Sequence, residues 1–269
     1  MPSGVLPLWR FLITDLGGVG ITLLDHLASE RMVTLKLNEA AEVTGTVPSD
    51  SNYVNRLHTD GFPLLAEGVR QLYCFRRESE TPPYYTIRAS TLVMQINDAA
   101  ASDDARSRFT AWDPWQYMMM RPVLQSSAAT GGTYTDYALI GPEGLIYGPA
   151  QEAGAIAIDM INTTIAGSTG GPLEAIGLFL GSFSEDGNSD PFGGTGYKIE
   201  QGTSLGQALQ DLCATGYIDI VLTPIYDPVG FPGALCDLNV LSQSSPYLGA
   251  GVFNYNAIFA WDMPGRNVT

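Results

Sequence analysis

The sequence predicts an α+β, β-rich protein: an N-terminal antiparallel β-barrel-like domain, then a mixed domain of helices packed on antiparallel sheet. Three observations support this. The first half has short segments rich in β-branched and aromatic residues, separated by turn clusters. Helix patterns with clear end signals lie mainly in the second half. A stretch rich in Ser, Ala, Thr and Gly at 125–135 separates the two, which predicts domains at 1–124 and 125–269.

The first half is predicted to be a series of short strands. They are expected over residues 8–16, 32–37, 68–76, 84–96 and 106–112. Residues 38–46 fit either a strand or a turn of helix, and the sequence leaves both open. Gly18-Val19-Gly20 follows a strand as a nucleotide-binding turn would. It lacks the third glycine and a clear following helix, so we expect a hairpin turn there.

The segment 108–122 predicts a strand that leads directly into a short helix. Asp113 supplies an acceptor for free helix amides, and Pro114 sits at a first helical position that needs no donor. The helix is apolar over most of its circumference, so it needs cover on several sides. Aromatic and methionine residues are enriched in interface cores, which makes this segment a candidate contact between subunits. Packing within one domain is the alternative. The candidate residues are Trp112, Trp115, Tyr117, Met118, Met119 and Met120.

The second half combines helices with strands. Residues 151–165 have the spacing of an amphipathic helix. Ser204 and Gln207 form a capping-box pair at the start of a second helix, and Gly216 signals its end. Strands are predicted over residues 217–223, 234–241 and 252–261. The last stretch, 252–269, is a candidate for returning to the first domain.

The net charge of −15 is uneven along the chain. Residues 1–125 hold 11 Lys and Arg against 14 acids, net −3, whereas residues 126–269 hold only Lys198 and Arg266 against 14 acids, net −12. Stable nucleic-acid binding by the second half is disfavoured, since such binding is driven by cation contacts. Two interpretations stay open: an acidic surface that aids solubility, and a surface that does not retain a passing polyanion.

Residues with catalytic or ligating chemistry are sparse, and no catalytic residue or cofactor is predicted. The three cysteines have no close spacing and are expected to be buried free thiols. Two histidines lie apart, and no serine or cysteine has a nucleophile motif. Asp186, Asn188 and Asp190 alternate like the start of a calcium loop, but Pro191 and Tyr197 occupy the glycine and glutamate positions. At most a loose surface cation loop is expected, and no metal site.

A carbohydrate-active enzyme or sugar-binding module is the alternative function. The 28 acids offer many carboxylate pairs, and aromatic residues flank sugar sites. Trp112-Asp113 and Trp261-Asp262 are the places where such a site is expected. A helix cap and a strand end explain the same residues.

Targeting features are absent from the apolar segments. The N-terminal apolar run contains Trp9 and Arg10 without a basic lead-in, unlike a secretory signal. No apolar run approaches the ~20 residues needed to cross a bilayer. We therefore expect a protein without a membrane anchor that is made in a bacterial cytoplasm.

Several segments together resemble a known family. Residues 72–77 (Leu-Tyr-Cys-Phe-Arg-Arg), 85–87 (Tyr-Thr-Ile) and 108–114 (Arg-Phe-Thr-Ala-Trp-Asp-Pro), with the helix end at Arg121-Pro122, resemble the N-terminal part of tail hub proteins of long-tailed bacteriophages, siphophage type. These are also called baseplate hub or tail-associated minor tail proteins. In the second half, the helix 209–216 with residues 218–220 and 224–228 is similar to the family's middle domain. Residues 266–268 resemble the strand that leads back to the tube domain.

The resemblance implies a structural component of the virion rather than an enzyme. Family hubs are homotrimers at the tail tip, and each subunit contributes tube-like β domains so that three copies match the six-fold tube. They bind the distal tail or tube protein, the tape measure protein, and tip or receptor-binding proteins. They surround the channel through which DNA leaves. A capsid or neck component is a further alternative, which would also assemble with other virion subunits and would differ only in its location. Full hubs are usually longer, so a chain of 269 residues fits a fragment, a split hub or a short relative.

Overall fold

The structure is a computed structural model of the 269-residue chain. It describes residues 8–24, 29–80, 83–98, 106–126, 137–148, 151–166, 178–183, 192, 195–229 and 233–242. The chain forms two compact units. The first contains Met1–Tyr117, Pro172–Phe179 and Leu222–Asp237, and the second contains Met118–Gly171, Leu180–Val221 and Leu238–Thr269. The predicted domains 1–124 and 125–269 stay a prediction, and the chain re-enters the first unit late in the sequence.

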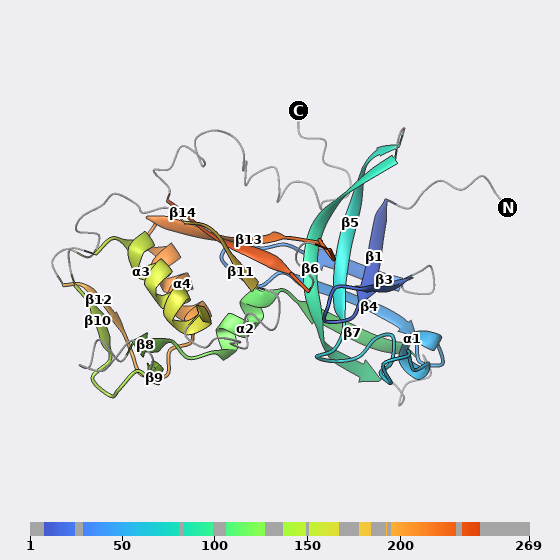
Figure 1. The fold of residues 1–269 in the computed structure, drawn as a ribbon, viewed down its shortest axis with the longest axis horizontal. Helices are drawn as coiled ribbons and strands as arrows, with labels where there is room; N and C mark the ends of the chain where they lie inside the picture. The colour runs from blue at the N-terminus through green and yellow to red at the C-terminus, as the bar shows by residue number, and fades with distance from the viewer. Residues whose placement is uncertain are drawn as a thin grey trace. The chain divides into compact units, whose positions relative to one another are not determined.

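The first unit is built on a seven-stranded sheet with the strand order β2-β1-β5-β6-β7-β4-β3 (Figure 1). All neighbouring strands are antiparallel. The strands are β1 (Trp9–Thr14), β2 (Gly20–Leu24), β3 (Ser29–Thr34), β4 (Glu42–Pro48), β5 (Gln71–Glu80), β6 (Pro83–Asp98) and β7 (Arg106–Trp112), and a short helix α1 (Asn52–Asn55) follows β4. The predicted β-rich α+β class is confirmed. Strand β4 settles the open choice for 38–46, and β2 was not predicted.

Among the described residues, the sheet that was expected to be barrel-like does not close into a complete barrel. In the part of the chain that the structure describes, β2 and β3 end the strand order and no backbone pairing joins them. Side chains approach across the opening instead. The Tyr53 hydroxyl donates to the Leu23 carbonyl at 2.9 Å, and Arg31 Nη1 to the Leu24 carbonyl at 3.5 Å. Strand β3 starts irregularly, with Glu30 at a φ of 51°, so it lacks a regular edge for β2.

The inner face of the sheet carries an apolar core. Its buried members are Phe11, Ile13, Leu24, Val43, Val47, Tyr53, Leu65, Leu72, Cys74, Ala89, Val93, Phe109 and Ala111. Gly45 of β4 lies opposite Phe109 of β7, and a Cβ atom at Gly45 would come within 2.6 and 2.7 Å of the Phe109 ring. The glycine therefore makes room for the Phe109 ring.

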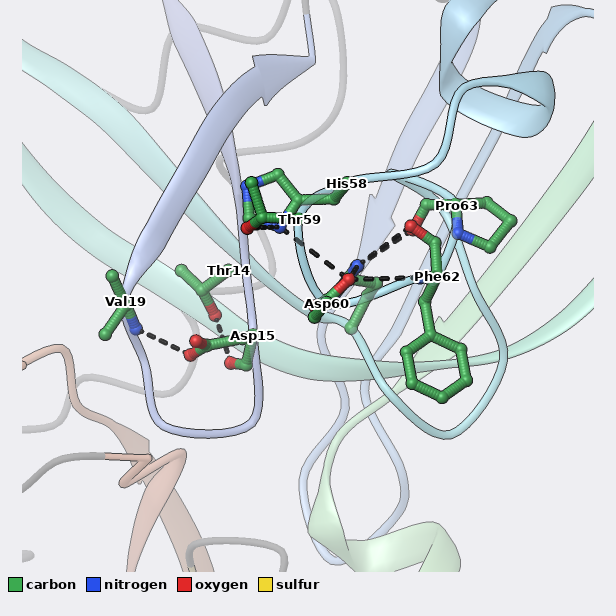
Figure 2. Close-up of polar contacts among 9 residues, drawn as sticks. Thr14, Asp15, Val19, His58, Thr59, Asp60, Phe62 and Pro63 are labelled. Atoms are coloured by element: carbon green, nitrogen blue, oxygen red, sulfur yellow. Dashed lines mark hydrogen bonds and ion pairs between the residues drawn. The ribbon is translucent and has the colours of Figure 1, made fainter.

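The turn between β1 and β2 is the hairpin that the glycines predicted. The Gly18 amide donates to the Asp15 carbonyl at 3.1 Å, and Gly18 has a φ of 75°. The Asp15 carboxylate accepts from the Val19 amide at 2.9 Å, as Figure 2 shows. The nucleotide-turn reading has no support here.

The second unit contains helix α3 (Ala153–Ile161), which continues as a π-helical turn, η2 (Asn162–Ala166), and helix α4 (Leu205–Ala214). Two small antiparallel sheets pair β8 (Leu124–Ser126) with β9 (Tyr137–Leu139), and β10 (Leu145–Tyr147) with β12 (Tyr197–Ile199). Strands β11 (Leu178–Phe183), β14 (Cys236–Ser242) and β13 (Ile218–Pro224) form a third sheet. The predicted strand 252–261, and the predicted return of 252–269, lie outside the described residues.

The predicted start and end of the second helix are confirmed, although the Gln207 side chain donates to Asp211 Oδ1 at 2.8 Å and so completes no reciprocal capping box. Ser204 Oγ accepts from the Gln207 amide at 3.2 Å, and Gly216 has a φ of 81° just past the helix end. Two tyrosines, Tyr147 buried and Tyr197 half-buried, fix the small sheet to the helices. The Tyr147 hydroxyl donates to Asp159 Oδ2 at 2.7 Å, and the Tyr197 hydroxyl donates to the Ala208 carbonyl at 3.0 Å. Among the described residues, no helix is long and apolar enough to cross a membrane.

We predict that Gly45→Ala destabilises the protein by about 1–3 kcal/mol, since the new methyl group overlaps the Phe109 ring in a fully packed core. Urea unfolding followed by tryptophan fluorescence measures the change. The double variant Gly45→Ala with Phe109→Leu is the control, because the smaller side chain relieves the overlap. If the double variant is no more stable than the sum of its single variants, the overlap is not the cause.

Candidate functional site

The junction of β7 with helix α2 (Pro114–Met120) is held by Asp113, as the sequence predicted. Asp113 Oδ1 accepts from the Trp115 amide at 3.0 Å and Oδ2 accepts from the Ala41 amide at 3.0 Å. The Asp113 amide in turn donates to the Ala41 carbonyl at 3.1 Å. One side chain thus caps the helix and joins it to the residue that precedes β4.

Burial of the Asp113 side chain raises its pKa to about 7, and the two backbone amides act in the opposite direction. Only 6% of the residue is exposed, and both carboxylate oxygens are occupied by amides. This carboxylate is therefore not accessible to a sugar, although Trp112-Asp113 was a candidate sugar site. Trp261 and Asp262, the other candidate pair, lie outside the described residues.

The structure gathers the predicted interface residues on one short segment, but with unequal exposure. Trp115 and Met118 are buried within the subunit, at 1% and 0% exposure. Trp112, Tyr117 and Met119 are half-buried. Met120 is 62% exposed, which leaves it available to a neighbour. The assignment of this segment to subunit contacts stays a prediction, with Met120 as its most accessible member.

The end of α2 packs closely on the start of α4. A Cβ atom at Gly206 would come within 2.5 Å of the Met119 sulfur and 2.8 Å of the Met119 amide nitrogen. The Leu205 amide donates to the Arg121 carbonyl at 2.7 Å, and the Val123 amide donates to the Thr203 carbonyl at 3.0 Å. Backbone hydrogen bonds therefore fix the chain that leaves α2 against the N-terminus of α4.

Two predictions concerned side chains that can ligate metals, namely a surface cation loop and three free cysteines. The predicted cation loop of Asp186, Asn188 and Asp190 lies outside the described residues. Among those that the structure does describe, no group of three or more His, Cys, Asp or Glu side chains is placed to hold a metal ion. The expectation of buried free thiols is confirmed for Cys74, Cys213 and Cys236. Burial raises the pKa of each thiol, to about 12 at Cys213.

An ion pair between a buried arginine and an exposed aspartate, which the sequence did not reveal, holds the loop before β5. Arg70 is 1% exposed, and its Nη1 and Nη2 donate to the two Asp60 carboxylate oxygens at 2.6 and 2.8 Å. Arg70 Nε also donates to the Pro63 carbonyl at 2.9 Å. Figure 2 shows Asp60 between His58 and the Phe62-Pro63 backbone. A single arginine ten residues after Asp60 carries no pairing signal in the sequence.

The Arg70 hydrogen bonds lower the Asp60 pKa well below its usual range. A lowered folded-state pKa means that this stabilising contribution is present above the unfolded pKa and is lost as the pH falls through the folded value. The loop presents two apolar side chains at its surface, Leu57 at 62% and Phe62 at 47% exposure. The ion pair therefore keeps an apolar surface loop in a fixed shape.

A second feature missed in the sequence is a row of buried polar side chains on the outer face of β5 and β6. Gln71, Tyr73 and Ser90 are each 1% exposed or less. Each hydrogen-bonds to a backbone carbonyl within residues 233–235. Alternation along β5 indicates which side chains share a face, but not that a segment more than 140 residues later covers them.

Comparison with known proteins gives structural similarity without sequence similarity. No protein-family model matches the sequence, and no curated protein matches it at a significant level. Similar solved structures include a 43 kDa tail protein of prophage MuSo2 from Shewanella oneidensis, with 12% identity, a TM-score of 0.43, and coverage of 88% of this chain and 55% of the other.

Two further solved structures align over similar lengths. A tail protein from Neisseria meningitidis MC58 has 11% identity and a TM-score of 0.42, with coverage of 88% of this chain and 53% of the other. The E. coli c3393 protein, described as a type VI secretion component with structural similarity to the T4 tail proteins gp27 and gp5, has 8% identity and a TM-score of 0.41, with coverage of 87% and 50%. The chain spans about half the length of these proteins. At these scores the similarity does not define a shared fold.

We predict that Gly206→Ala destabilises the protein by about 1–3 kcal/mol, because the methyl group meets the backbone of Met119 and a change of rotamer cannot relieve the overlap. Helix propensity alone predicts the opposite sign, a gain of up to about 1 kcal/mol. Chemical denaturation therefore distinguishes the two effects by sign. Gln210→Ala, in the same helix, is the control. A stabilised Gly206→Ala protein would contradict the close approach of α2 and α4.

We predict that Asp113 makes the protein less stable as the pH rises from about 4 to 7. Its folded-state pKa is raised, so its stabilising contribution is full below the unfolded pKa of 3.8 and is lost as the pH passes about 7. The slope is at most about 1.4 kcal/mol per pH unit. Asp113→Asn should remove this component, whereas Asp50→Asn, at an exposed position, should retain it. Urea midpoints at pH 5, 6, 7 and 8 measure it, and identical profiles for wild type and Asp113→Asn would refute it.

Proposed function

We propose that the chain is a structural component of a phage tail tip, a hub of the siphophage type that joins the tail tube or distal tail protein to tip or receptor-binding proteins around the DNA exit channel. One observation carries the proposal. The segments that resemble tail hubs, 72–77, 85–87 and 108–114, fall in β5, β6 and the end of β7, which are adjacent central strands of the sheet. The resemblance thus covers one continuous piece of structure.

The proposed assembly is a homotrimer in the virion, in contact with the tape measure protein as well as its tube-side and tip-side partners. Rigidity supports a structural role. The Asp60–Arg70 pair fixes a surface loop, and Asp113 and Gly206 fix the two ends of α2. Surfaces with fixed shape lose little conformational entropy when they meet a partner.

The charge supports passage of DNA rather than its retention. The chain carries a net charge of −15 and only 13 Lys and Arg residues. Acidic side chains around a channel repel phosphate. They also provide none of the cationic contacts that would hold DNA in place during ejection. In this proposal DNA passes through the trimer without stable binding, and the subunit performs no catalysis and needs no cofactor.

The oligomeric state tests the proposal. We predict that the purified chain sediments as a trimer at micromolar concentration, and that Met120→Gln raises the trimer dissociation constant at least about tenfold, because it places an amide in an apolar contact. Leu57→Gln is the matched control, since Leu57 and Met120 are both 62% exposed in the subunit. A monomer at all concentrations would reject the trimer. Equal weakening by both variants would reject the α2 interface.

The location in the virion needs a separate experiment. Intact phage particles carrying a small tag at the exposed Val229 position should show label density at the tail tip by electron microscopy. Label at the neck or capsid would reject the tip assignment while leaving a structural role in place.

A further inference from the structure

Two arginines and a tyrosine share the outer face of the neighbouring strands β1, β5 and β6 (Figure 1). Arg10 of β1 lies opposite Phe75 of β5, so Arg77, two residues further along β5, lies on the same face as Arg10. Tyr85 of β6 is paired with Arg77 and shares that face. We call Arg10, Arg77 and Tyr85 the arginine patch. It faces away from the apolar core, since Phe11, the next residue after Arg10, belongs to that core.

The guanidinium of Arg10 is stacked on the Tyr85 ring. Its Cζ atom lies 4.2 Å from the ring centroid. In the part of the chain that the structure describes, the Arg10 side chain forms no ion pair and no hydrogen bond. Stacking occupies the flat face of a guanidinium, so its N–H donors, which lie in the plane, stay available. Arg10 therefore presents a positioned set of donors that no acceptor of the described chain occupies.

The acid next to Arg77 in the sequence is engaged on the other face of the hairpin. The Glu78 carboxylate accepts from Arg88 Nη2 at 2.5 Å and from the Thr86 hydroxyl at 2.7 Å. Thr86 directly follows Tyr85 in β6, so its side chain lies on the face opposite to the patch. Glu78 thus leaves the positive charge of the patch in place.

The composition of the patch fits a protein surface that carries carboxylates. Arginine and tyrosine are enriched among the side chains that dominate binding at interfaces. A guanidinium also pairs with a carboxylate through two parallel hydrogen bonds. Stable DNA binding needs many cation contacts, whereas the patch offers only Arg10 and Arg77, on a chain with a net charge of −15. A carboxylate is therefore a better match than the phosphates of DNA.

The second half of the same chain supplies such carboxylates. Residues 126–269 hold 14 acids and only two cationic side chains. Among the exposed acids described there, Asp159 is bound by Tyr147 and Glu200 is paired with Lys198. The other two, Glu143 and Asp211, have no cationic partner among the described residues.

The patch also restricts the symmetry of a contact between copies. Two patches that met across a two-fold axis would place arginine against arginine, which is repulsive. The patch of one copy is better matched by a different surface of the next copy. Contacts of this head-to-tail kind close into rings, such as a trimer, when the rotation between subunits permits it.

We propose that the arginine patch binds the Glu143 and Asp211 carboxylates of a second copy of this chain, and that this contact joins neighbouring subunits head to tail. The inference rests on the proposed homotrimer and adds the surface that links its subunits. Arg10 supplies paired hydrogen bonds to a carboxylate, and Arg77 adds positive charge. Because Tyr85 already orders the Arg10 guanidinium, less conformational entropy is lost when the acid arrives.

Sedimentation velocity of the full chain tests the proposal with a variant on each side of the contact. Arg10→Glu should raise the trimer dissociation constant at least about tenfold, since it sets like charges against each other. The double variant Glu143→Gln with Asp211→Asn should also raise it. Arg56→Glu is the matched control, because Arg56 is exposed, lies outside the patch and undergoes the same change of charge.

Salt gives a second readout. Raising NaCl from about 0.05 to 0.5 M shortens the range of charge interactions, so it should weaken the wild-type trimer more than the Arg10→Glu trimer. Circular dichroism checks that each variant is folded. If Arg10→Glu does not fold, Arg10→Gln replaces it, because it removes the charge and keeps a polar side chain.

A trimer that Arg10→Glu weakens no more than Arg56→Glu would overturn the patch contact and leave the hub proposal in place. An unchanged trimer in the double variant at positions 143 and 211 would overturn it as well. A wild-type chain that is monomeric at all concentrations would reject the trimer, and this contact with it. Binding of a fluorescent DNA duplex that is abolished by Arg10→Glu would identify the patch as a phosphate site and likewise reject the proposal.

Discussion

Strand β5 buries side chains on both faces, and this constraint organises the first unit. Leu72 and Cys74 point into the apolar core, while Gln71 and Tyr73 lie on the opposite face with polar atoms removed from water. A buried hydroxyl or amide without a partner costs about 1–3 kcal/mol, so that face needs acceptors. A flat apolar cover would leave these groups unsatisfied. Residues 233–235 present three carbonyls that satisfy these groups, which explains why this face is covered by a segment outside any helix or strand.

At the open edge of the sheet, side chains hydrogen-bond to the backbone carbonyls in place of a neighbouring strand. A strand edge with free amides and carbonyls is a site for pairing with other chains. Here the last carbonyls of β2 accept from Tyr53 and Arg31, and the Arg31 guanidinium also lies 5.2 Å from the Phe11 ring centroid. These contacts come from a helix and from the strand at the other end of the sheet order. The sheet therefore rolls toward closure without the regular shear that a true barrel requires.

Local signals were predictable from the sequence, and long-range ones were not. The Ser204 cap, the Asp113 junction and the Gly18 hairpin each depend on neighbours within a few residues, and each is confirmed. Strand β2 was missed because it is only five residues long and directly follows a glycine turn. The Arg70 ion pair and the hydrogen bond of Tyr73 with the Ala234 carbonyl depend on tertiary placement, over ten and 161 residues. Whether a barrel-like sheet closes is likewise not readable from sequence, since it depends on whether two distant edges meet, and among the described residues β2 and β3 do not pair.

Assembly of so acidic a chain has to rely on contacts at short range. Copies with a charge of −15 repel one another, but salt screens this repulsion beyond about 8–10 Å, so it opposes approach more than contact. Isolated exposed apolar side chains are common on any protein and define no interface by themselves. The end of α2 differs because its backbone is fixed, by Asp113 at the start and by the close packing of Met119 on Gly206 at the end. The backbone at Met120 is thus held in one place before any partner arrives, and a contact made there loses little backbone entropy on binding.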